Sequence, residues 1–565
     1  MLLCCFLNQA NCDCCGLFLL FLLLFFFWLD IIIYKTLNYR VYLNDVILFS
    51  RETNAIYTFI QALKFSPKDL ALVIFGAINI FTAIGFVFVA RRSVFFGRLL
   101  IYLAIPTGVI FLFFTKKDPD YIFNDTVMNF MEINYPSGVD KEYLDNKKNI
   151  GKIDSIKKIG IDGENTSRNN VILLVIESLS AYHLETLLPN QKKYTPFLDN
   201  LAKQNSYFSN FFANGFTTDG GLISLLTGRN PVPSIGRYKS VDAFQGFDCI
   251  DDSLPQFMKS KGYKTNFFSN SSLEFTNLGG WTKSIGFDYV EGPNNNFYKE
   301  WEKGLFGAVE DRALFLRLLN WMDGREETAN EPYMAVLMTH STHPPFVDPV
   351  TKSNIETEVY QYMDKSVEQF FNELTKRGFF TQGGILLITG DHRAYTPISH
   401  LERISFGETA RARIPFIAVG DAGIDKGKIE TYAQQVDLIN SMKALLNENK
   451  FLIPAHRGVF LGKTPKPAEF ILHASGKDRD QIKVFFPEGE LGNIKLNGNE
   501  TVWQGRKPPE SENILHAIAA DRTSRGPATV NYVDYLYKVT FDTTYGAGKF
   551  ATGSNCTKNY SNPNY

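Results

Sequence analysis

Carboxylate and imidazole side chains come directly after three hydrophobic segments, residues 170–176, 333–338 and 384–389. In chain order they are Glu177, His340, His343, Asp391 and His392. Continuous apolar segments of this length are typical of strands that are covered on both faces of a sheet. Ligands of open α/β sheets bind beyond the carboxyl ends of the strands, so we expect these side chains to meet at one site.

The donor set of this site predicts a metal ion. Carboxylate oxygens with a single imidazole nitrogen suit a hard or borderline divalent cation. We therefore expect one ion, Mn²⁺ before Mg²⁺ or Zn²⁺, at Glu177, Asp391 and His392. Each residue also has an ordinary alternative: the carboxylates could cap the helix or turn that they enter, and His392 could be a packed, hydrogen-bonded histidine.

A pair of threonines lies between the first two hydrophobic segments. Residues 214–221 read Asn-Gly-Phe-Thr-Thr-Asp-Gly-Gly and precede an apolar stretch, which predicts a glycine-flanked turn into a helix. The free N–H groups and the positive dipole end of such a helix favour an anion. A threonine hydroxyl is a weak nucleophile unless a metal lowers its pKa. Thr217 and Thr218 are thus candidate nucleophiles, with ordinary helix-start residues as the alternative.

The segments that carry these residues alternate with helical ones. A fourth apolar segment spans residues 414–419, Thr195 and Pro196 have the pattern of a helix start, and residues 358–375 have a helical pattern. Alternation of this kind predicts an α/β domain with a largely parallel sheet between helices, at residues 169–465.

The first 115 residues are rich in Phe and poor in charge, and they contain apolar runs at residues 16–33, 70–90 and 94–114. Each run approaches the ~20 residues that a helix needs to cross a bilayer. Arginines around the turn between the last two runs predict that this turn is cytoplasmic. We expect a multi-pass anchor in the cell (inner) membrane at residues 1–115, with the following domain periplasmic or extracellular. Buried core helices are the alternative.

Two further regions flank the α/β domain. Residues 116–168 are mixed and polar and predict a connector, with an interfacial helix at residues 121–131. Short strand patterns at residues 482–486 and 493–496 predict a small β-rich region and a tail at residues 466–565.

The bulk composition narrows the function classes. Lys plus Arg (58) and Asp plus Glu (59) nearly cancel, so nothing in the overall charge supports nucleic-acid binding. Five of the seven Cys residues lie before residue 16, which leaves only Cys249 and Cys556 in the outer part of the chain. No disulfide framework is expected, and the fold must rest on its own core.

Six sequence motifs resemble, in the same order, those of the lipoteichoic acid synthase and phosphoglycerol transferase family, in the sulfatase-like branch of the alkaline phosphatase superfamily. They lie at residues 175–178 (Val-Ile-Glu-Ser), 194–198 (Tyr-Thr-Pro-Phe-Leu), 210–217 (Asn-Phe-Phe-Ala-Asn-Gly-Phe-Thr), 284–288 (Ser-Ile-Gly-Phe-Asp), 343–346 (His-Pro-Pro-Phe) and 390–392 (Gly-Asp-His). The resemblance covers about residues 169–462. It implies an alkaline-phosphatase-like fold with a mixed, mostly parallel sheet.

The resemblance also implies roles for single residues. The residues that match the family's metal ligands are Glu177, Thr217, Asp391 and His392. Thr217 rather than Thr218 matches the nucleophile, because the family's threonine comes two residues after a glycine, here Gly215. His343 matches the histidine that faces the substrate phosphate, whereas His340 has no counterpart and could be structural.

One element of the family is missing. The lipoteichoic acid synthases carry a Trp-x-Arg element that contacts the glycerol phosphate. In those proteins it lies just before the motif that corresponds to residues 284–288 here. The corresponding residues 275–280 read Phe-Thr-Asn-Leu-Gly-Gly. Lys283 or another cation could take the place of this element. Arg393 could also neutralise a phosphate, although ordinary surface pairing is the alternative for it. A different headgroup would also account for the departure.

The resemblance implies a transferase that moves a phosphoglycerol-type headgroup from a phospholipid to an acceptor hydroxyl on a glycan or envelope polymer, through a phosphothreonine. Sulfatases of the superfamily need Cys or Ser in a Cys/Ser-x-Pro/Ala-x-Arg setting, which residues 217–221 lack. Sulfate-ester hydrolysis is therefore disfavoured. Phosphoethanolamine transfer, phosphodiester hydrolysis and non-catalytic binding to the cell envelope stay open as alternatives.

Overall fold

The structure is a computed structural model that describes residues 158–163, 169–189, 192–231, 244, 247, 250–325, 331–344, 346–446, 449–474, 481–489, 491–497 and 500–506. The predicted anchor at residues 1–115 and the predicted interfacial helix at residues 121–131 lie outside these residues. Within the described parts, no helix is long and apolar enough to cross a membrane.

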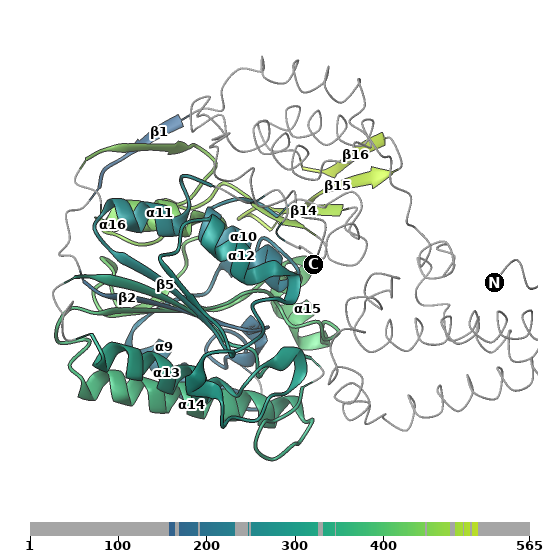
Figure 1. Ribbon diagram of the computed structural model, residues 1–565. Coiled ribbons are helices and arrows are strands. Elements are labelled where there is room, and N and C mark those ends of the chain that lie inside the picture. The colour runs from purple at the N-terminus through teal and green to yellow at the C-terminus, as the bar shows by residue number, and fades with distance from the viewer. Residues whose placement is uncertain are drawn as a thin grey trace, which may run out of the picture. The chain divides into compact units, whose positions relative to one another are not determined.

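An eight-stranded mixed sheet forms the centre of the described domain, in the order β10-β3-β9-β8-β2-β7-β5-β6 (Figure 1). The parallel strands are β8 (Ile385–Gly390), β2 (Val171–Ile176), β7 (Tyr333–Met338), β5 (Lys264–Ser269) and β6 (Tyr289–Glu291). The remaining strands are β9 (Phe416–Val419), antiparallel to β8 and to β3 (Ser206–Phe208), and β10 (Gly427–Ile429), parallel to β3. The predicted mixed, mostly parallel sheet is confirmed, and all four predicted segments are strands.

Helices cover both faces of the sheet (Figure 1). One face carries α9 (Pro196–Gln204), α13 (Asp311–Asp323) and α14 (Glu356–Lys376), and the other carries α10 (Thr218–Thr227), α11 (Leu254–Ser260), α12 (Leu278–Ser284) and α16 (Leu438–Leu446). Alternate residues of β2 enter the two cores: Leu173 packs with the α10 side and Leu174 with the α14 side. Because both faces are covered, the strand is apolar at every position.

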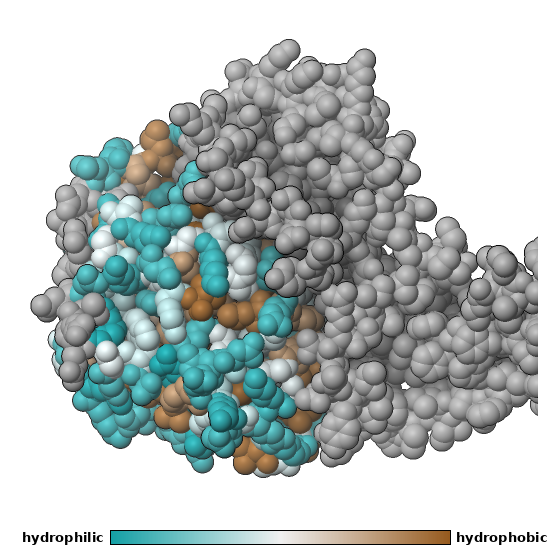
Figure 2. Space-filling model, viewed as in Figure 1, coloured by the Kyte–Doolittle hydropathy of each residue, from teal (hydrophilic) through white to brown (hydrophobic). Residues whose placement is uncertain are grey.

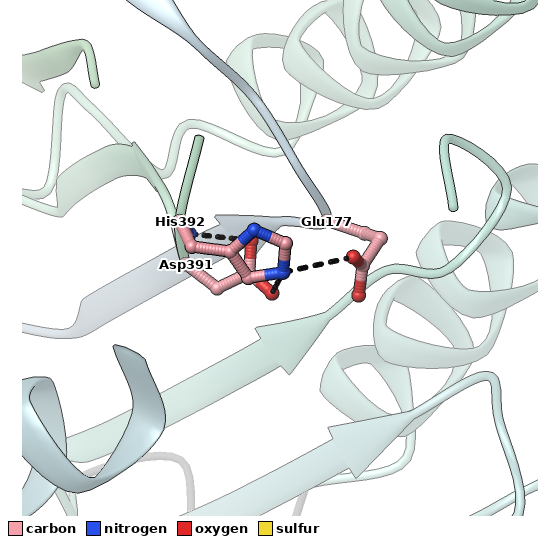
Figure 3. A group of neighbouring side chains, drawn as sticks. All are labelled: Glu177, Asp391 and His392. Atoms are coloured by element: carbon pink, nitrogen blue, oxygen red, sulfur yellow. Dashed lines mark hydrogen bonds and ion pairs between the residues drawn. The ribbon is translucent and has the colours of Figure 1, made fainter. Parts of the chain in front are cut away.

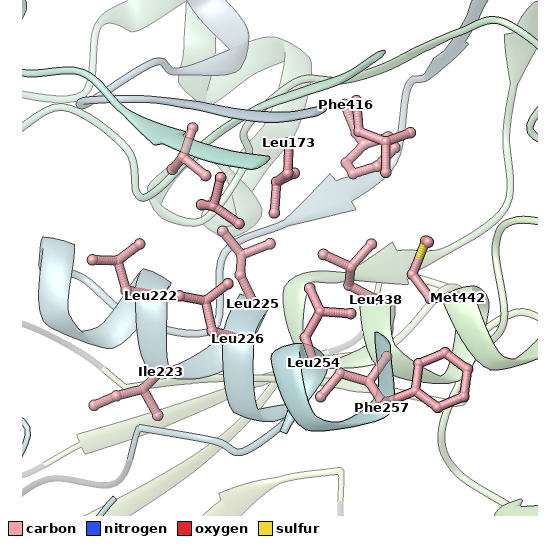
Figure 4. Close-up of a cluster of buried hydrophobic side chains, with 14 of the residues drawn as sticks. Leu173, Leu222, Ile223, Leu225, Leu226, Leu254, Phe257, Phe416, Leu438 and Met442 are labelled. Carbon is pink, nitrogen blue, oxygen red and sulfur yellow. The ribbon is translucent and has the colours of Figure 1, made fainter. Parts of the chain in front are cut away.

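Helix α10 packs tightly against one face of the sheet. Leu222, Leu225 and Leu226 lie next to Leu173 of β2, with residues of α11 and α16 beside them (Figure 4). All residues from Gly220 to Thr227 are buried. The first turn of α10, which carries the candidate nucleophiles, is therefore fixed relative to the strand ends.

The predicted helix at residues 358–375 is confirmed as the central part of α14. The predicted start at Pro196 is also confirmed, but Thr195 does not cap α9 with its side chain. Its hydroxyl donates to the carbonyl of His183 at 2.7 Å. Asp364 of α14 caps α9 instead, accepting N–H bonds from Phe197 (2.7 Å) and Leu198 (2.9 Å).

The predicted β-rich region contains a four-stranded antiparallel sheet of β13 (Ile471–Ala474), β14 (Gln481–Phe485), β15 (Leu491–Asn497) and β16 (Glu500–Gly505). The predicted segments correspond to β14 and β15. The smaller pairings are β1 (Lys158–Ile161) with β12 (Phe451–Pro454) and β4 (Phe211–Phe212) with β11 (Ala433–Gln434). Strand β13 contacts the segment before α10, since Ala474 N donates to Asn214 O at 2.9 Å.

Candidate active site

Glu177, Asp391 and His392 meet at the carboxyl ends of β2 and β8 (Figure 3). One ligand atom from each residue lies within 4.8 Å of the other two, and all three residues are buried. The two strands are parallel neighbours with Ile176 opposite Gly390, so the residues that follow them reach the same edge of the sheet. The structure thus brings the three residues together as one group, here called the carboxylate–imidazole cluster.

The spacing within the cluster fits a metal ion. His392 Nε2 lies 3.3 Å from Glu177 Oε1 and 3.3 Å from Asp391 Oδ2. Ligand atoms about 2.1 Å from a four-coordinate ion are separated by ~3.4 Å at tetrahedral angles. Oδ1 of Asp391 accepts N–H bonds from Ser178 (2.7 Å) and His392 (2.8 Å), while Oδ2 accepts no hydrogen bond from the described residues. A buried carboxylate oxygen without a donor suits a cation.

A threonine hydroxyl supplies a fourth atom at the same spacing. Oγ1 of Thr218 lies 3.3 Å from Glu177 Oε2 and 3.4 Å from His392 Nε2. Thr217, which the motif comparison favours, precedes it as the N-cap residue of α10, and its side chain makes no capping bond to the helix. Both threonines lie at the predicted helix start, but it is the Thr218 hydroxyl that contacts the cluster.

The electrostatics of the cluster favour a bound cation. Burial raises the pKa of Asp391 to about 7, and the charge of Glu177 adds to this effect. Burial opposes a charge on His392, but Asp391 and Glu177 together raise its pKa to about 9. Burial alone would raise the pKa of Glu177 as well, but the hydrogen bond and charge of His392 hold it well below its ordinary value. The two buried carboxylates thus share the one positive charge of His392. A divalent ion would supply a positive charge for each of them.

The backbone around Glu177 is held by the end of β7. Glu177 N donates to Thr339 Oγ1 at 3.1 Å, and Glu177 O accepts from Thr342 Oγ1 at 2.6 Å. The next residue, Ser178, has a left-handed φ of 57°, which a non-glycine residue rarely adopts. Its N–H donates to Asp391 and its carbonyl accepts from Tyr360 OH at 2.8 Å. These contacts maintain the strained turn at the site.

Gln435 connects the threonine loop with the metal-site loop, and sequence reasoning missed it. Its Oε1 accepts from Asn214 N at 3.1 Å, while its Nε2 donates to Gly390 O (3.1 Å) and Asp391 O (2.6 Å). Gln435 lies more than 40 residues from each of these partners along the chain, so no local sequence pattern predicts the contact. The side chain thus links the segment before the candidate nucleophiles to the Asp391 loop.

His343 and His340 follow β7 on either side of the Thr342 contact to Glu177. Their rings stack with centroids 4.9 Å apart, and Phe306 packs edge-on against both. Burial lowers the pKa of His340 to about 3 and also lowers the pKa of His343. The structure therefore places a neutral imidazole pair beside the cluster, and the phosphate-facing role of His343 stays a prediction.

The structure does not bring Arg393 into the cluster. The guanidinium is buried and donates from Nε and Nη2 to the two carboxylate oxygens of Glu402, at 3.0 Å each. Its Nη1 donates to the carbonyls of Ala394 and Thr396 at 2.6 Å. These contacts engage Arg393 within the loop that follows His392, so the substrate role predicted for it lacks geometric support.

Lys283 also lies away from the cluster. It is exposed in the last turn of α12, just before the turn that leads into β6. Strand β6 runs parallel to β5, which runs parallel to β7, so β6 begins at the edge of the sheet opposite the cluster. The position was predicted from its nearness in sequence to the missing Trp-x-Arg element, but α12 carries it to the other edge.

Buried carboxylates, an imidazole and a hydroxyl lie together at the carboxyl edge of the parallel strands, and this set of donor atoms could hold a divalent ion. Residues 169–448 match the family model described as Sulfatase.

The chain is also similar to individual proteins. Lipoteichoic acid synthase 2 of Bacillus subtilis is 24% identical over 388 residues, which cover 60% of this chain and 56% of the relative. Lipoteichoic acid synthase 1 of the same organism is 25% identical over 302 residues, covering 48% and 45%. A solved structure from Vibrio parahaemolyticus, a protein in the alkaline phosphatase superfamily, has a TM-score of 0.49 and 19% identity, covering 70% of this chain and 96% of its own. The chain spans about half the length of the curated relatives.

The predicted resemblance is thereby confirmed. The two relatives are named as synthases.

Proposed function

We propose that the protein is a membrane-anchored, metal-dependent transferase that moves a phosphoglycerol-type headgroup from a phospholipid to an acceptor hydroxyl of a glycan or envelope polymer. The observation that carries the proposal is the threonine hydroxyl at 3.3–3.4 Å from the buried carboxylate–imidazole cluster. The similarity to two lipoteichoic acid synthases supports the choice of headgroup and acceptor class.

The chemistry follows from the positions of the side chains. Glu177, Asp391 and His392 would hold one divalent ion, Mn²⁺ in the first instance, which when bound lowers the pKa of a hydroxyl and offsets phosphate charge. A threonine oxygen attacks the phosphorus, the bond between phosphorus and the diacylglycerol oxygen breaks, and diacylglycerol leaves with a proton. An acceptor hydroxyl then attacks the same phosphorus and restores the threonine. The N–H groups at the start of α10 orient the phosphate oxygens in both steps.

Two threonines compete for the role of nucleophile. The family motif favours Thr217, whose hydroxyl is not used in capping α10. The contacts in the structure favour Thr218, whose hydroxyl is at ligand spacing. We propose that one of these two threonines becomes the phosphothreonine.

Trapping the covalent intermediate tests the proposal. The full chain with Mn²⁺ is incubated with phosphatidylglycerol or phosphatidylethanolamine, and the peptide containing residues 217 and 218 is measured by mass spectrometry. We expect a glycerol phosphate adduct that either Thr217→Ala or Thr218→Ala abolishes, but not both, and that Thr375→Ala on the exposed side of α14 leaves intact. A bare phosphate adduct would select hydrolysis, and the absence of any adduct would reject covalent transfer.

Phosphoethanolamine transfer is the second candidate. Lys283 and Arg393, the cations predicted for a glycerol phosphate, both lie away from the cluster. An ethanolamine phosphate adduct in the same experiment would establish this alternative.

The proposed location follows from the proposed donor. An anchor at residues 1–115 would hold the catalytic domain at the outer face of the cell (inner) membrane, where the lipid headgroup is concentrated. Cleavage of the catalytic domain by a protease added to intact spheroplasts tests this location, and complete protection would contradict it.

A further inference from the structure

Exposed aliphatic side chains gather on the two segments that leave the candidate active site. Val350 and Ile355, between His343 and α14, are 63% and 54% exposed. Leu401 and Ile404, on α15 (His400–Phe406) after His392, are 42% and 70% exposed. The other exposed large hydrophobic residues of the described parts are Tyr289, Leu316 and Leu452. Single exposed hydrophobic residues are normal, but four on two segments beside one site form a pattern.

The two segments are neighbours in space. The hydroxyl of Tyr182 donates to Glu356, the residue after Ile355, and lies 2.9 Å from Oγ1 of Thr396, which precedes α15. Leu401 and Ile404 are three residues apart on α15, so they share one side of the helix. Figure 2 shows hydrophobic surface on the side of the domain where Figure 1 places α15. Val350, Ile355, Leu401 and Ile404 are here called the apolar rim.

The buried ion pair of the His392 loop fixes the orientation of α15. Glu402 points inward to Arg393 and also accepts the N–H of Ser399 at 2.9 Å. Leu401 and Ile404 flank Glu402 in sequence but remain exposed. Arg403 is exposed too, and among the described residues it has no ion-pair partner. The outer side of α15 thus combines aliphatic side chains with a cation.

We propose that the apolar rim docks on the surface of a phospholipid bilayer and brings the candidate active site close to the lipid headgroups. This inference rests on the proposed function, because the phosphate of a phospholipid donor lies at the bilayer surface. Aliphatic side chains next to a basic residue are typical of elements that insert into the headgroup boundary of anionic membranes. The residues of the apolar rim follow His343 and His392 in sequence. Docking of the rim would therefore bring the phospholipid donor close to these histidines.

Kinetics on two forms of one donor test the inference. The full chain is reconstituted in vesicles of phosphatidylglycerol and phosphatidylcholine, and transfer is compared with that from monomeric dihexanoyl phosphatidylglycerol in solution. We expect Leu401→Ser with Ile404→Ser to slow transfer from the vesicle lipid at least about tenfold, with less than about a twofold change for the soluble donor. The matched control is Leu452→Ser on β12, 62% exposed, which should change neither rate. An equal loss on both donors, or no loss on either, would overturn the inference.

A second measurement does not depend on turnover. Phosphatidylglycerol with a photoactivatable acyl chain is irradiated with the reconstituted protein, and crosslinked peptides are identified. Lipid adducts on residues 398–406 support docking, whereas lipid adducts confined to residues 1–115 contradict it. If the wild-type protein transfers from neither donor, the proposed function fails, and the crosslinks alone decide whether the rim meets lipid.

Discussion

Arg393 follows His392 and holds the segment after it in place. Its ion pair with Glu402 closes the loop at residues 393–402, and its guanidinium also lies over the ring of Tyr182 at 5.2 Å. His392 Nδ1 lies 2.8 Å from Arg393 O, so the orientation of the imidazole depends on the backbone of this loop. We interpret Arg393 as a positioning residue for His392 rather than as a substrate cation.

This interpretation predicts the result of Arg393→Met. The variant leaves the Glu402 carboxylate buried without its partner, which costs about 3–5 kcal/mol. It also loosens His392, so the affinity for Mn²⁺ should fall about 10–100-fold. Thermal melting and metal titration measure the two effects. Adding Glu402→Gln to the variant should recover most of the melting temperature. Unchanged metal affinity in a folded Arg393→Met protein would show that the loop does not position His392.

Asp391 gives the more direct test of the metal site. Asp391→Asn keeps the size of the side chain but removes the charge of Oδ2, the oxygen that accepts no hydrogen bond within the described parts of the chain. Metal affinity should fall by more than the about 10–100-fold that losing a hydrogen-bond partner of a ligand costs, because Asp391 is itself a proposed ligand. Chelation of the metal should lower the melting temperature of the wild-type protein, because an ion that binds only the folded state stabilises it.

Asp323→Asn on the exposed end of α13 serves as the control for Asp391→Asn, since among the described residues Asp323 forms its ion pair with Arg377, far from the cluster in sequence. If chelation shifts the melting temperature of wild type and Asp391→Asn by equal amounts, the cluster does not bind the ion.

At the scale of elements, Gly221 allows α10 to approach the loop after β8. A Cβ atom built on Gly221 would lie 2.2 Å from the carbonyl oxygen of Asp391, which is backbone and has little freedom to move. The same loop is held to Asn214 by Gln435. The distance between the threonines and the cluster is therefore set by backbone contact between two elements.

Gly221→Ala should separate α10 from the Asp391 loop. We expect a loss of about 1–3 kcal/mol of stability from overpacking and a larger fractional loss of transfer rate, because a small displacement of reacting atoms costs about 100-fold. Gly324→Ala at the end of α13 is the control, since the nearest atom to its Cβ is 3.6 Å away. A Gly221→Ala enzyme with wild-type rate and stability would contradict the close packing.

The sequence predicts some of these elements and not others for identifiable reasons. β2 and β8 are continuous apolar segments, so their ends, and with them Glu177 and Asp391, could be found. β5 reads Lys-Thr-Asn-Phe-Phe-Ser, and its polar residues break the apolar pattern. In the structure Thr265 is paired with Asp288 and Asn266 Nδ2 bonds to Met334 O, contacts that no local pattern reveals.

The threonine pair shows a second limit of sequence reasoning. Motif spacing favours Thr217, but which hydroxyl reaches the cluster depends on where α10 begins and how it is rotated. A shift of one residue along a helix turns the side chain by about 100°. The rotation of α10 is set by its contacts with Asp391 and Leu173, which lie far along the chain.

At the scale of the whole molecule, buried neutral histidines make stability depend on pH. Burial lowers the pKa of His473 to about 4 and that of His456 to about 3. In the unfolded chain both histidines have the ordinary pKa of 6.5. Between pH 6.5 and 4 the unfolded chain therefore binds more protons at these residues than the folded one, and acid favours unfolding.

Between pH 6.5 and pH 5, each of these histidines should lower the free energy of unfolding by about 2 kcal/mol, at about 1.36 kcal/mol per pH unit. The melting temperature should fall over this range, and less steeply in His473→Gln, which removes one of the titrating groups. The glutamine can still donate to Ala213 O, the partner of His473 Nδ1 in front of the threonine loop. His400→Gln on the exposed end of α15 should keep the wild-type slope. If the melting temperatures of wild type and His473→Gln fall equally steeply with pH, the contact between β13 and Ala213 tolerates a charged imidazole. The β-rich sheet is then attached to the active-site loop more loosely than the burial of His473 implies.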